Sequence, residues 1–539
     1  MAMAGPALSE EPVYFADPNL QAVVEEALGI YGPTQTDMLD LICLDACSRG
    51  SVDLTGLEYA TNLTTLYLTI NQIRDISPLS NLTKLKALRL HRNQISDIST
   101  LKGLTNLEYL DLSDNRISDI YAVRELTNLT SLNLRLNQIS DISVLSELTN
   151  LTSLILFDNQ ISDISPISGL TNLTCLFLYN NQISDISPIS RLTNLTWLKL
   201  NSNQISDISA LSNLTNLTRL GLSDNQISDI SVLSNLTNLN ELWLYDNQIS
   251  DIFALSGLTS LTKLSLNKNQ ISDVSMLSGL MNLRKLYLEH TSVSDISVLS
   301  GLKNLTGLWL SNNQISDISA LSGLANLTDL HLGSNTISDI PVLKGLPNLT
   351  MLNLSRNHIG NISALSGLTN LTRLYLSYNQ IGEVSALSGL KKLRVLSLND
   401  NQISDVSMLS RLTNLETLDL RNNHISDISG LSGLTGLEYL GLLNNPLNSA
   451  AYYIYLPLIS SSNPDLNNLS LGYDPNPNPL IDDWGVELPN LIEFANNFGK
   501  TGCGEQNDWC GQADLNRSGS VDVNDFVELL ENYFGGSEQ

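Results

Sequence analysis

The sequence has few basic residues, no long hydrophobic run and few cysteines, and each shortage excludes a class of protein. Its 28 Lys and Arg stand against 55 Asp and Glu, which gives a net charge of −27. Nucleic-acid binding is excluded because such a chain offers no cationic surface that could displace the counterions of a phosphate backbone. No stretch approaches the roughly 18 consecutive apolar residues of a membrane-spanning helix. The sequence therefore predicts no membrane span.

Five cysteines are too few for a scaffold held together by disulfides. Cys43 and Cys47 would share one face of a strand roughly 13 Å apart, which is too far to bridge. Cys175 falls in the register of Cys43, and we expect all three thiols to be free. Cys503 and Cys510 flank a short polar loop near the end of the chain. We predict that this last pair forms a disulfide.

What the sequence does contain is a 22-residue repeat, represented by LTRLGLSDNQISDISVLSNLTN at residues 217–238. Its Asn recurs every 22 residues from Asn71 to Asn445, and only Thr291 interrupts the series. A half-formed copy with Arg49 in the Asn position comes before it. The period and the L-x-x-L-x-L-x-x-N form predict a leucine-rich repeat solenoid of about 18–19 copies over residues 41–446.

Each repeat is expected to form one coil of this solenoid. Leu217, Leu220 and Ile227 are spaced to point inward, where stacked neighbours bury them. The alternation over residues 219–223 predicts a short strand, so the stack carries a parallel sheet on its concave side. The remaining I-S-D-I-S-x-L has room only for a 3₁₀ turn on the convex side. We expect the Asn amide to bond inward-facing backbone groups and Asp229 to cap the turn rather than bind calcium.

Both ends of the solenoid need a cover. Residues 1–40 are predicted to hold a disordered start over residues 1–12 and a helical cap. In that cap Asp17 is the N-cap of a helix that ends at Gly29, and a second short helix covers residues 35–39.

The chain after the repeats is predicted to contain a C-terminal cap, a linker and a small helical domain. The cap has a helix within residues 449–466 and an extended piece at residues 469–471. The Pro-rich DPNPNP opens a stiff linker. The boundaries are residues 447–473 for the cap, 474–483 for the linker and 484–539 for the domain.

The small domain contains a loop with the ligand spacing of a calcium site. Gly519 holds the sixth position of DLNRSGSVDVND, where the loop must turn sharply. Oxygen ligands fall at positions 1, 3, 5, 7, 9 and 12, which are Asp514, Asn516, Ser518, Ser520, Asp522 and Asp525. An earlier copy of the loop-helix has Pro479, Ile481 and Trp484 where ligands and glycine belong. We therefore predict one Ca²⁺ site.

Two resemblances follow from these motifs. The Asp at the twelfth position and the duplicated loop-helix resemble a type I dockerin, and NFGKTGCGEQNDWCGQADLNRSGSVD resembles the dockerin-like tails of secreted bacterial proteins. The NQISDISPL repeats and the N-terminal cap resemble the bacterial internalin family. That resemblance implies a secreted or cell-surface protein that binds other proteins on its concave face. The resemblance of the tail to a dockerin implies docking or anchoring, with a cohesin-like protein as the partner of the tail.

The prediction of the cellular compartment depends on the first residues of the sequence. MAMAGPALSEEPVYF lacks an apolar signal core. We expect that a signal segment was removed and that Met1 was added for expression. A cytosolic protein is the alternative, because cytosolic phosphatase regulators share this repeat length.

The concave positions lie two, four and six residues before each repeat Asn, and there the repeats differ. Aromatic side chains at these positions are typical anchors for a partner, although aromatics also favour strands for other reasons. The predicted partner-binding residues are Phe157, Phe177, Tyr179, Trp197, Arg219, Trp243, Tyr245, Tyr287, Trp309 and Tyr375. Nearby basic residues could attract an acidic protein loop or an anionic glycan, or could balance Glu241, Asp246 and Glu289. These basic residues are Lys199, Arg219, Lys263, Lys268 and Lys285.

No catalytic constellation is present. The five histidines are scattered over different repeats, and none is placed with a Ser, Cys or carboxylate as a triad requires. We predict a recognition or adhesion protein without enzymatic activity, which binds a protein or glycan. A structural, self-assembling envelope component and a cytosolic scaffold are the alternatives.

Overall fold

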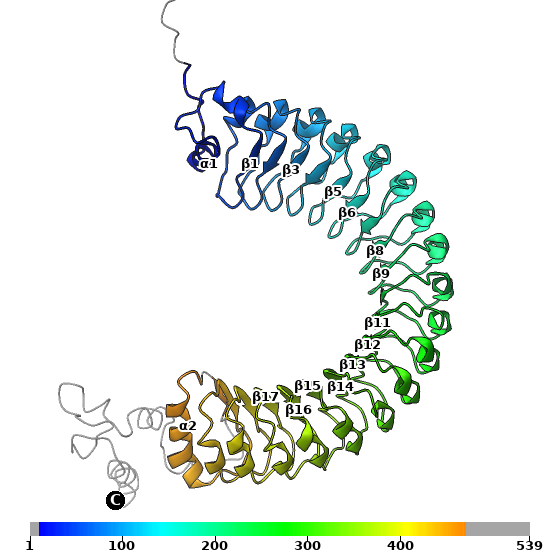
Figure 1. The fold of residues 1–539 in the computed structure, drawn as a ribbon, viewed down its shortest axis with the longest axis vertical. Coiled ribbons are helices and arrows are strands. Elements are labelled where there is room, and N and C mark those ends of the chain that lie inside the picture. The colour runs from blue at the N-terminus through cyan, green and yellow to red at the C-terminus, as the bar shows by residue number, and fades with distance from the viewer. Residues whose placement is uncertain (1–9, 467, 471–539) are drawn as a thin grey trace, which may run out of the picture. The chain divides into compact units, whose positions relative to one another are not determined.

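The computed structural model describes residues 10–466 and 468–470, which form two units that meet in sequence between Ile271 and Ser272. Each unit is a stack of 22-residue coils. In every coil a three-residue strand lies on the inner side of the curve and a helical turn lies on the outer side (Figure 1). The predicted solenoid, with its strands on the concave side of each unit and short 3₁₀ turns opposite them, is confirmed.

The first unit begins with helix α1 (Pro18–Leu28). Its strands are β1 (Cys43–Asp45), β2 (Thr65–Tyr67), β3 (Ala87–Arg89), β4 (Tyr109–Asp111), β5 (Ser131–Asn133), β6 (Ser153–Ile155), β7 (Cys175–Phe177), β8 (Trp197–Lys199), β9 (Arg219–Gly221), β10 (Glu241–Trp243) and β11 (Lys263–Ser265). Its 3₁₀ turns are Asp37–Asp40, Leu57–Tyr59, Ser77–Asn81, Ser99–Gly103, Tyr121–Glu125, Ser143–Glu147, Ser165–Gly169, Ser187–Arg191, Ser209–Asn213, Ser231–Asn235 and Phe253–Leu255.

The second unit repeats this arrangement and ends in a helical segment. Its strands are β12 (Lys285–Tyr287), β13 (Gly307–Trp309), β14 (Asp329–His331), β15 (Met351–Asn353), β16 (Arg373–Tyr375), β17 (Val395–Ser397), β18 (Thr417–Asp419), β19 (Tyr439–Gly441) and β20 (Asn468–Ser470). Its 3₁₀ turns are Ser275–Gly279, Ser297–Gly301, Ser319–Leu321, Pro341–Gly345, Ser363–Gly367, Ser385–Leu387, Ser407–Arg411 and Ser429–Leu431. A π-helical turn (Ala451–Tyr455) leads into α2 (Leu456–Ser462).

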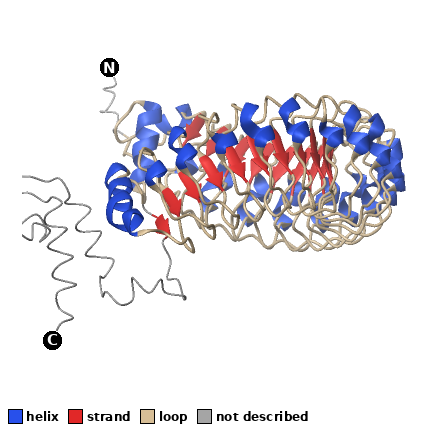
Figure 2. Ribbon diagram, turned by 90° about the horizontal axis from the view of Figure 1, so that it is seen from below, coloured by secondary structure: helices blue, strands red, loops and turns tan. Residues whose placement is uncertain are grey.

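Within each unit the strands pair in parallel with their neighbours along the chain, and equivalent repeat positions face each other. Gly221, for example, pairs with Lys199 on one side and with Trp243 on the other. Figure 2 shows the strands lying side by side with the helical turns around them. The inward positions are sealed, since Leu220, Leu222 and Ile227 have no exposed surface. Side chains at one repeat position therefore form rows across neighbouring strands.

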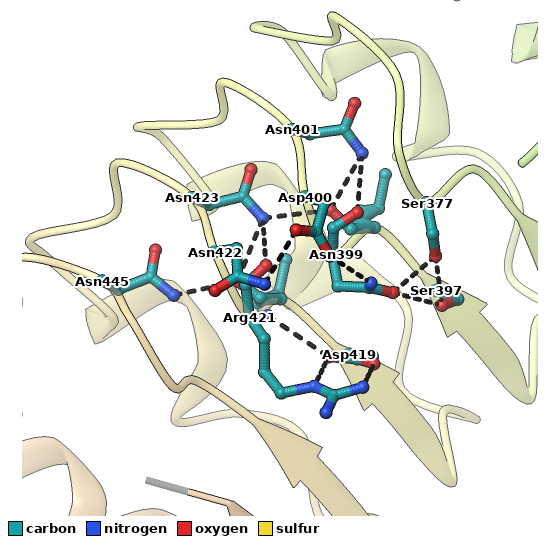
Figure 3. Close-up of polar contacts among 12 residues, drawn as sticks. Ser377, Ser397, Asn399, Asp400, Asn401, Asp419, Arg421, Asn422, Asn423 and Asn445 are labelled. Carbon is teal, nitrogen blue, oxygen red and sulfur yellow. Dashed lines mark hydrogen bonds and ion pairs between the residues drawn. The ribbon is translucent and has the colours of Figure 1, made fainter. Parts of the chain in front are cut away.

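The repeat Asn side chains hold successive coils together, as predicted. The Asn423 amide Nδ2 donates to the carbonyls of Leu398 and Leu420, each at 3.0 Å (Figure 3). Its Oδ1 accepts the Ile403 N–H at 3.0 Å. Each such Asn gives partners to backbone groups of two coils that no strand pairing reaches. Thr291 supplies only a hydroxyl, which donates to the Leu288 carbonyl at 3.0 Å.

The Asp residues at the start of the outer turns also behave as predicted. Asp229 Oδ1 accepts the backbone N–H of Ser231 at 2.8 Å, and this bond lowers the pKa of Asp229. Asp75, Asp97 and Asp119 repeat the contact, and Asn361 substitutes for it by accepting the Ser363 N–H. These carboxylates cap turns.

The N-terminal cap forms around Asp17. Its carboxylate accepts the N–H groups of Asn19 and Leu20 at the start of α1, and Gly29 ends the helix in the left-handed conformation with φ 67°. The predicted helix over residues 35–39 is instead a 3₁₀ turn at Asp37–Asp40, because the Asp37 carboxylate binds the N–H and hydroxyl of Thr34. The expected disorder of residues 1–12 is wrong for Pro12, which forms an antiparallel bridge with Thr34.

The C-terminal cap has a helix within residues 449–466, as predicted, but this helix is less regular than expected. Pro457 has no N–H to donate, and the chain makes a π turn before α2. Asn463 then ends α2 and ties it to the last repeat, because it donates to the Leu434 carbonyl at 2.7 Å and accepts the Leu437 N–H at 2.6 Å. The predicted extended piece is β20, which pairs with β19.

One backbone feature was not predicted. The residue before each repeat Asn, and before Arg49 and Thr291 at the same position, has a positive φ of 51° to 58°. Asn and Asp tolerate this conformation, but Ile70, Leu136 and Lys268 also adopt it. It costs an ordinary side chain roughly 1–2 kcal/mol. The amide ladder and the strand pairing hold the backbone in this conformation.

The predicted free thiols are confirmed, since Cys43, Cys47 and Cys175 are unpaired. Burial raises the pKa of the Cys175 thiol. Across the described residues, no helix is long and apolar enough to cross a membrane.

Candidate interaction surface

Each repeat presents three side chains on the strand face, at the predicted positions two, four and six before its Asn. The β9 repeat shows the alternation. Leu220 and Leu222 are buried in the core, whereas Arg219 is exposed on the strand face. Because equivalent positions align in rows, a comparison of successive repeats shows which side chains lie next to one another on the strand face.

Aromatic side chains gather on β6, β7 and β8 and pack against one another. The rings of Phe157 and Tyr179 stack with centroids 4.0 Å apart, and those of Phe177 and Trp197 meet edge to face at 4.8 Å. Such pairs contribute roughly 0.5–1.5 kcal/mol each beyond their burial. Phe157 is left only 8 % exposed, so the expectation of an exposed ring does not hold at this position. Phe177, Tyr179 and Trp197 remain half-buried and accessible.

The basic residues of the first unit divide into paired and unpaired groups. Arg219 Nε lies 3.6 Å from Glu241, and Lys268 Nζ lies 3.2 Å from Asp246. Lys199 Nζ instead lies 5.2 Å from the ring centroids of Phe177 and Trp197. Among the described residues, no carboxylate comes within 4.0 Å of it. Charge balance thus accounts for Arg219 and Lys268, and Lys199 is a cation held by aromatic rings.

A recess of about 380 Å³ opens between β8 and β10, where Gly221 separates Lys199 from Trp243. Tyr179 and Tyr245 stand at its two sides. The remaining lining residues are Asn180, Asn201 and Ser202. Gly221 has no side chain, and a Cβ there would lie 2.3 Å from Asn201 Oδ1. The Asn201 side chain therefore lies in the space that a larger residue at position 221 would need.

Tyr245 is fixed at the edge of the recess. Its hydroxyl donates to Asp224 Oδ2 at 2.8 Å, and the Ser202 hydroxyl donates to the same oxygen at 3.2 Å. Burial, together with this hydrogen bond, raises the pKa of Tyr245 to about 12. The ring is consequently neutral at physiological pH and held in one orientation.

The second unit carries a separate group of aromatic side chains. Trp309 stacks between Tyr287, at 4.2 Å, and His331, at 5.4 Å between ring centroids. Burial lowers the pKa of His331. Two carbons of the Trp309 ring would lie 2.4 Å from a Cβ at Gly307, so the indole lies across that glycine. Lys285 is exposed on β12 and Tyr375 is half-exposed on β16.

Beyond these rings, the strand face of the second unit is polar. Asp419 forms an ion pair with both Arg421 nitrogens that face it, at 2.8 and 2.6 Å, and Asp400 accepts from Asn399 and Asn422 (Figure 3). These polar groups bond to one another.

The predicted calcium ligands Asp514, Asn516, Ser518, Ser520, Asp522 and Asp525 lie outside the described residues, as do Cys503 and Cys510. The same is true of the predicted linker and small domain. Within the part of the chain that the structure describes, no group of three or more His, Cys, Asp or Glu side chains could hold a metal ion.

The prediction from sequence missed the small and polar residues of the recess. It selected Trp243 and Tyr245 for their size, but Asn180, Asn201 and Ser202 also line the recess, and the Asn201 side chain packs over Gly221. The sequence did indicate an uneven surface here. In the row of Lys199, Gly221 and Trp243, a residue without a side chain separates two large side chains.

Comparison with known proteins gives consistent matches over the repeats. The family model described as "Leucine Rich repeats (2 copies)" matches residues 61–103, 105–147, 149–191, 193–235, 237–279, 282–323, 325–367, 369–411 and 413–451. No curated protein matches the chain.

Three solved structures illustrate the structural similarity. An internalin, InlF from Listeria monocytogenes, is 35% identical, with a TM-score of 0.53 over 68% of this chain and 98% of the other. The ectodomain of the Arabidopsis thaliana receptor kinase GASSHO1/SCHENGEN3, in complex with CASPARIAN STRIP INTEGRITY FACTOR 2, is 26% identical, with a TM-score of 0.64 over 75% of this chain and 56% of the other. The plant peptide hormone receptor RGFR1, in complex with RGF2, is 25% identical, with a TM-score of 0.59 over 78% of this chain and 76% of the other.

Proposed function

Because the chain belongs to the leucine-rich repeat family, we propose that it is a non-enzymatic recognition protein that binds a protein partner through the strand face of its repeats. The observation that carries this proposal is the set of half-exposed aromatic side chains on otherwise uniform coils. Aromatic anchors on a rigid surface lose little conformational entropy on binding. The two plant relatives, which are described in complex with a protein factor and a peptide hormone, support a ligand of this class.

The proposal assigns the main contacts to Trp243 and Tyr245 in the first unit and to Trp309 in the second. Trp243 and Tyr245 border the recess, and Trp309 lies flat on its strand between two other rings. The surrounding surface is supplied by Phe177, Tyr179, Trp197, Arg219, Tyr287 and Tyr375. Phe157 stacks against the ring of Tyr179.

Replacing Trp243, Tyr245 and Trp309 together with alanine is expected to weaken partner binding at least about 100-fold, because truncating such anchors typically removes 2 kcal/mol or more each. Partners would be recovered from the native envelope, purified and titrated individually by biolayer interferometry.

The matched control replaces three exposed aromatic residues away from the strand face, Tyr31, Tyr121 and Phe253, which are 89%, 58% and 66% exposed. This control should bind as the parent does. Equal affinity of the two triple variants, with intact far-ultraviolet circular dichroism, would refute the assignment of the binding surface.

We further propose that the protein is secreted or displayed at the cell surface and that its tail is a dockerin-like domain stabilised by Ca²⁺. The spacing of Asp514, Asn516, Ser518, Ser520, Asp522 and Asp525 supports this proposal, as does the similarity to an internalin. The tail would dock or anchor the solenoid, with a cohesin-like protein as its partner class.

Calcium titration of the full chain by calorimetry is expected to give one site, which Asp514→Ala abolishes because it removes the first ligand of the loop. Asp229→Ala, which alters a turn cap of the solenoid, should leave the titration unchanged. Two equivalent sites, or a titration that survives Asp514→Ala, would contradict the proposed loop.

A further inference from the structure

The coils of β5 to β8 carry positive charge and no negative charge on their strand face. The three strand-face positions of each of these coils, which together we call the β5–β8 face, include Arg135 and Lys199 but no Asp or Glu. The chain as a whole has 55 acidic against 28 basic residues, so a surface without carboxylates departs from its general character. Such a surface attracts the negative groups of a partner.

Both cations of the β5–β8 face lie over aromatic rings. Arg135 Cζ is 5.3 Å from the ring centroid of Phe157, and Lys199 Nζ is 5.2 Å from those of Phe177 and Trp197. In the part of the chain that the structure describes, neither cation has a carboxylate oxygen within 4.0 Å. The ring contacts restrict both side chains, so less conformational entropy is lost when an anion binds to them.

Two carboxylates near this face are already bonded to other groups. Asp158 Oδ1 accepts the Asn180 amide at 2.6 Å. Asp224 Oδ2 accepts the hydroxyls of Tyr245 and Ser202 at 2.8 and 3.2 Å. The two cations are therefore left to pair with carboxylates that a partner supplies.

Apolar side chains separate the two cations. Ile155 and Phe177 are paired on the adjacent strands β6 and β7, and both are half-exposed. In the next row the rings of Phe157 and Tyr179 stack with centroids 4.0 Å apart. A ligand that reaches both cations must place an uncharged, apolar group over these side chains, because a charge there would lose its water without gaining a partner.

The spacing of the cations defines the spacing of the acidic groups that fit them. Arg135 and Lys199 belong to coils three repeats apart, which places them roughly 14 Å apart at about 4.8 Å per strand. An extended chain advances roughly 3.3 Å per residue, so residues four apart span about 13 Å and point to the same side. The residue midway between them also points to that side.

We propose that the β5–β8 face binds an extended acidic segment of the protein partner, with the pattern acid-x-apolar-x-acid. The segment lies across the strands. One carboxylate pairs with Arg135, the other pairs with Lys199, and the apolar side chain between them packs on Ile155 and Phe177. This inference rests on the proposed function, because it names the chemistry of the protein partner.

A sulfated glycan is the competing ligand. It would also pair with the two cations, but its charges recur along a hydrophilic chain and would lie against Ile155 and Phe177 as well. A peptide can carry acidic groups at the two ends of the face and an apolar group between them. The apolar side chains therefore favour a peptide.

The test titrates the full chain with blocked heptapeptides at low ionic strength, followed by calorimetry and tryptophan fluorescence. TETFTET carries the proposed pattern, TQTFTQT lacks its charges, and TTFEETT has the same composition with its two acidic residues adjacent. TETFTET is expected to bind with a Kd on the order of 1 mM. The other two should bind about five- to tenfold more weakly, since neither can pair with both cations.

A double variant tests the assigned cations. Arg135→Gln combined with Lys199→Met should bind TETFTET and TQTFTQT equally. The matched control combines Arg373→Gln with Lys285→Met, which removes the same charge from exposed strand-face positions of the second unit. This control should keep the preference of the parent for TETFTET.

Equal binding of TETFTET and TQTFTQT by the parent, no binding at about 10 mM TETFTET, or a preference that survives in the Arg135→Gln and Lys199→Met double variant would each overturn the inference. Tighter binding of a heparin-derived octasaccharide than of TETFTET would assign the face to a glycan instead. If the double variant does not fold, the comparison of the three peptides on the parent still decides the outcome.

Failure of this inference differs from failure of the proposed function. If the strand face does not bind the partner, the triple variant of Trp243, Tyr245 and Trp309 keeps its partner affinity. If only the acidic segment is wrong, that variant loses its partner while the parent shows no preference among the peptides.

Discussion

Replacing Asn247 with alanine is expected to lower the free energy of unfolding by about 3–5 kcal/mol, a loss large enough to disrupt the surrounding coils. The Asn247 amide donates to the carbonyls of Leu222 and Leu244 at 3.1 and 3.2 Å, and its Oδ1 accepts the Ile227 N–H at 3.0 Å. The side chain is 8 % exposed, so water cannot replace it. Alanine leaves buried backbone groups of two coils without partners.

Urea unfolding measures the loss, and hydrogen exchange locates it, since coils near residue 247 should lose amide protection first. Gln248→Ala, one residue away and exposed, is the control and should be within about 0.5 kcal/mol of the parent. Asn247→Thr should fall between the two, because Thr291 shows that a hydroxyl can take over one of the carbonyl contacts. A small effect of Asn247→Ala would mean that the ladder does not hold the coils together.

The coil itself could be predicted because its determinants are periodic and buried. Leu220, Leu222 and Ile227 have no exposed surface, and shifting the register by one residue would turn such side chains toward solvent. The Asn amide was predictable for a related reason, since a polar side chain at a core position must find backbone partners. Periodicity identifies positions whose role is the same in every coil.

Features that depend on backbone conformation or on neighbouring coils could not be predicted in this way. The positive-φ residue before each Asn is Asp224 in one repeat, Ile70 in another and Lys268 in a third, so residue type does not reveal the conformation. The burial of Phe157 depends on how Tyr179 stacks over it. The recess is lined in part by Asn180, Asn201 and Ser202, whereas prediction from sequence selected large side chains.

The ends of the stack follow local chemistry rather than the repeat. At the C-terminal end, the helix expected within residues 449–466 contains a π-helical turn before Pro457 and ends at Asn463, which bonds to the last repeat. At the N-terminal end, the Asp-Pro signal identified α1 correctly, because an N-cap followed by proline is specific on its own. The sequence did not indicate that the same Asp17 also contacts the first repeat.

Replacing Asp17 with alanine is expected to destabilise the N-terminal cap by about 2–4 kcal/mol at pH 7, since one carboxylate serves two elements. Its Oδ1 accepts the N–H groups of Asn19 and Leu20 in α1, at 2.8 and 3.3 Å. Its Oδ2 accepts those of Val52 and Asp53 in the first repeat, at 2.6 and 3.4 Å. The residue is only 5 % exposed, so its loss separates α1 from the coil that it covers.

The effect should depend on pH in a defined direction. Burial alone would raise the pKa of Asp17, but the four backbone donors outweigh it and lower the pKa below 3.8. The unfolded chain therefore binds the proton more readily, and the stabilisation is complete above the unfolded-state pKa of about 3.9 and lost as the pH falls through the lower folded-state pKa. Hydrogen exchange of α1 amides at pH 7 and at a pH below the unfolded-state pKa, and urea unfolding over the range between them, measure it. Asp17→Asn should remove this pH dependence, whereas Asp40→Ala, at an exposed position of the cap, should preserve it. Unchanged α1 protection in Asp17→Ala would show that the helix is held by its apolar face alone.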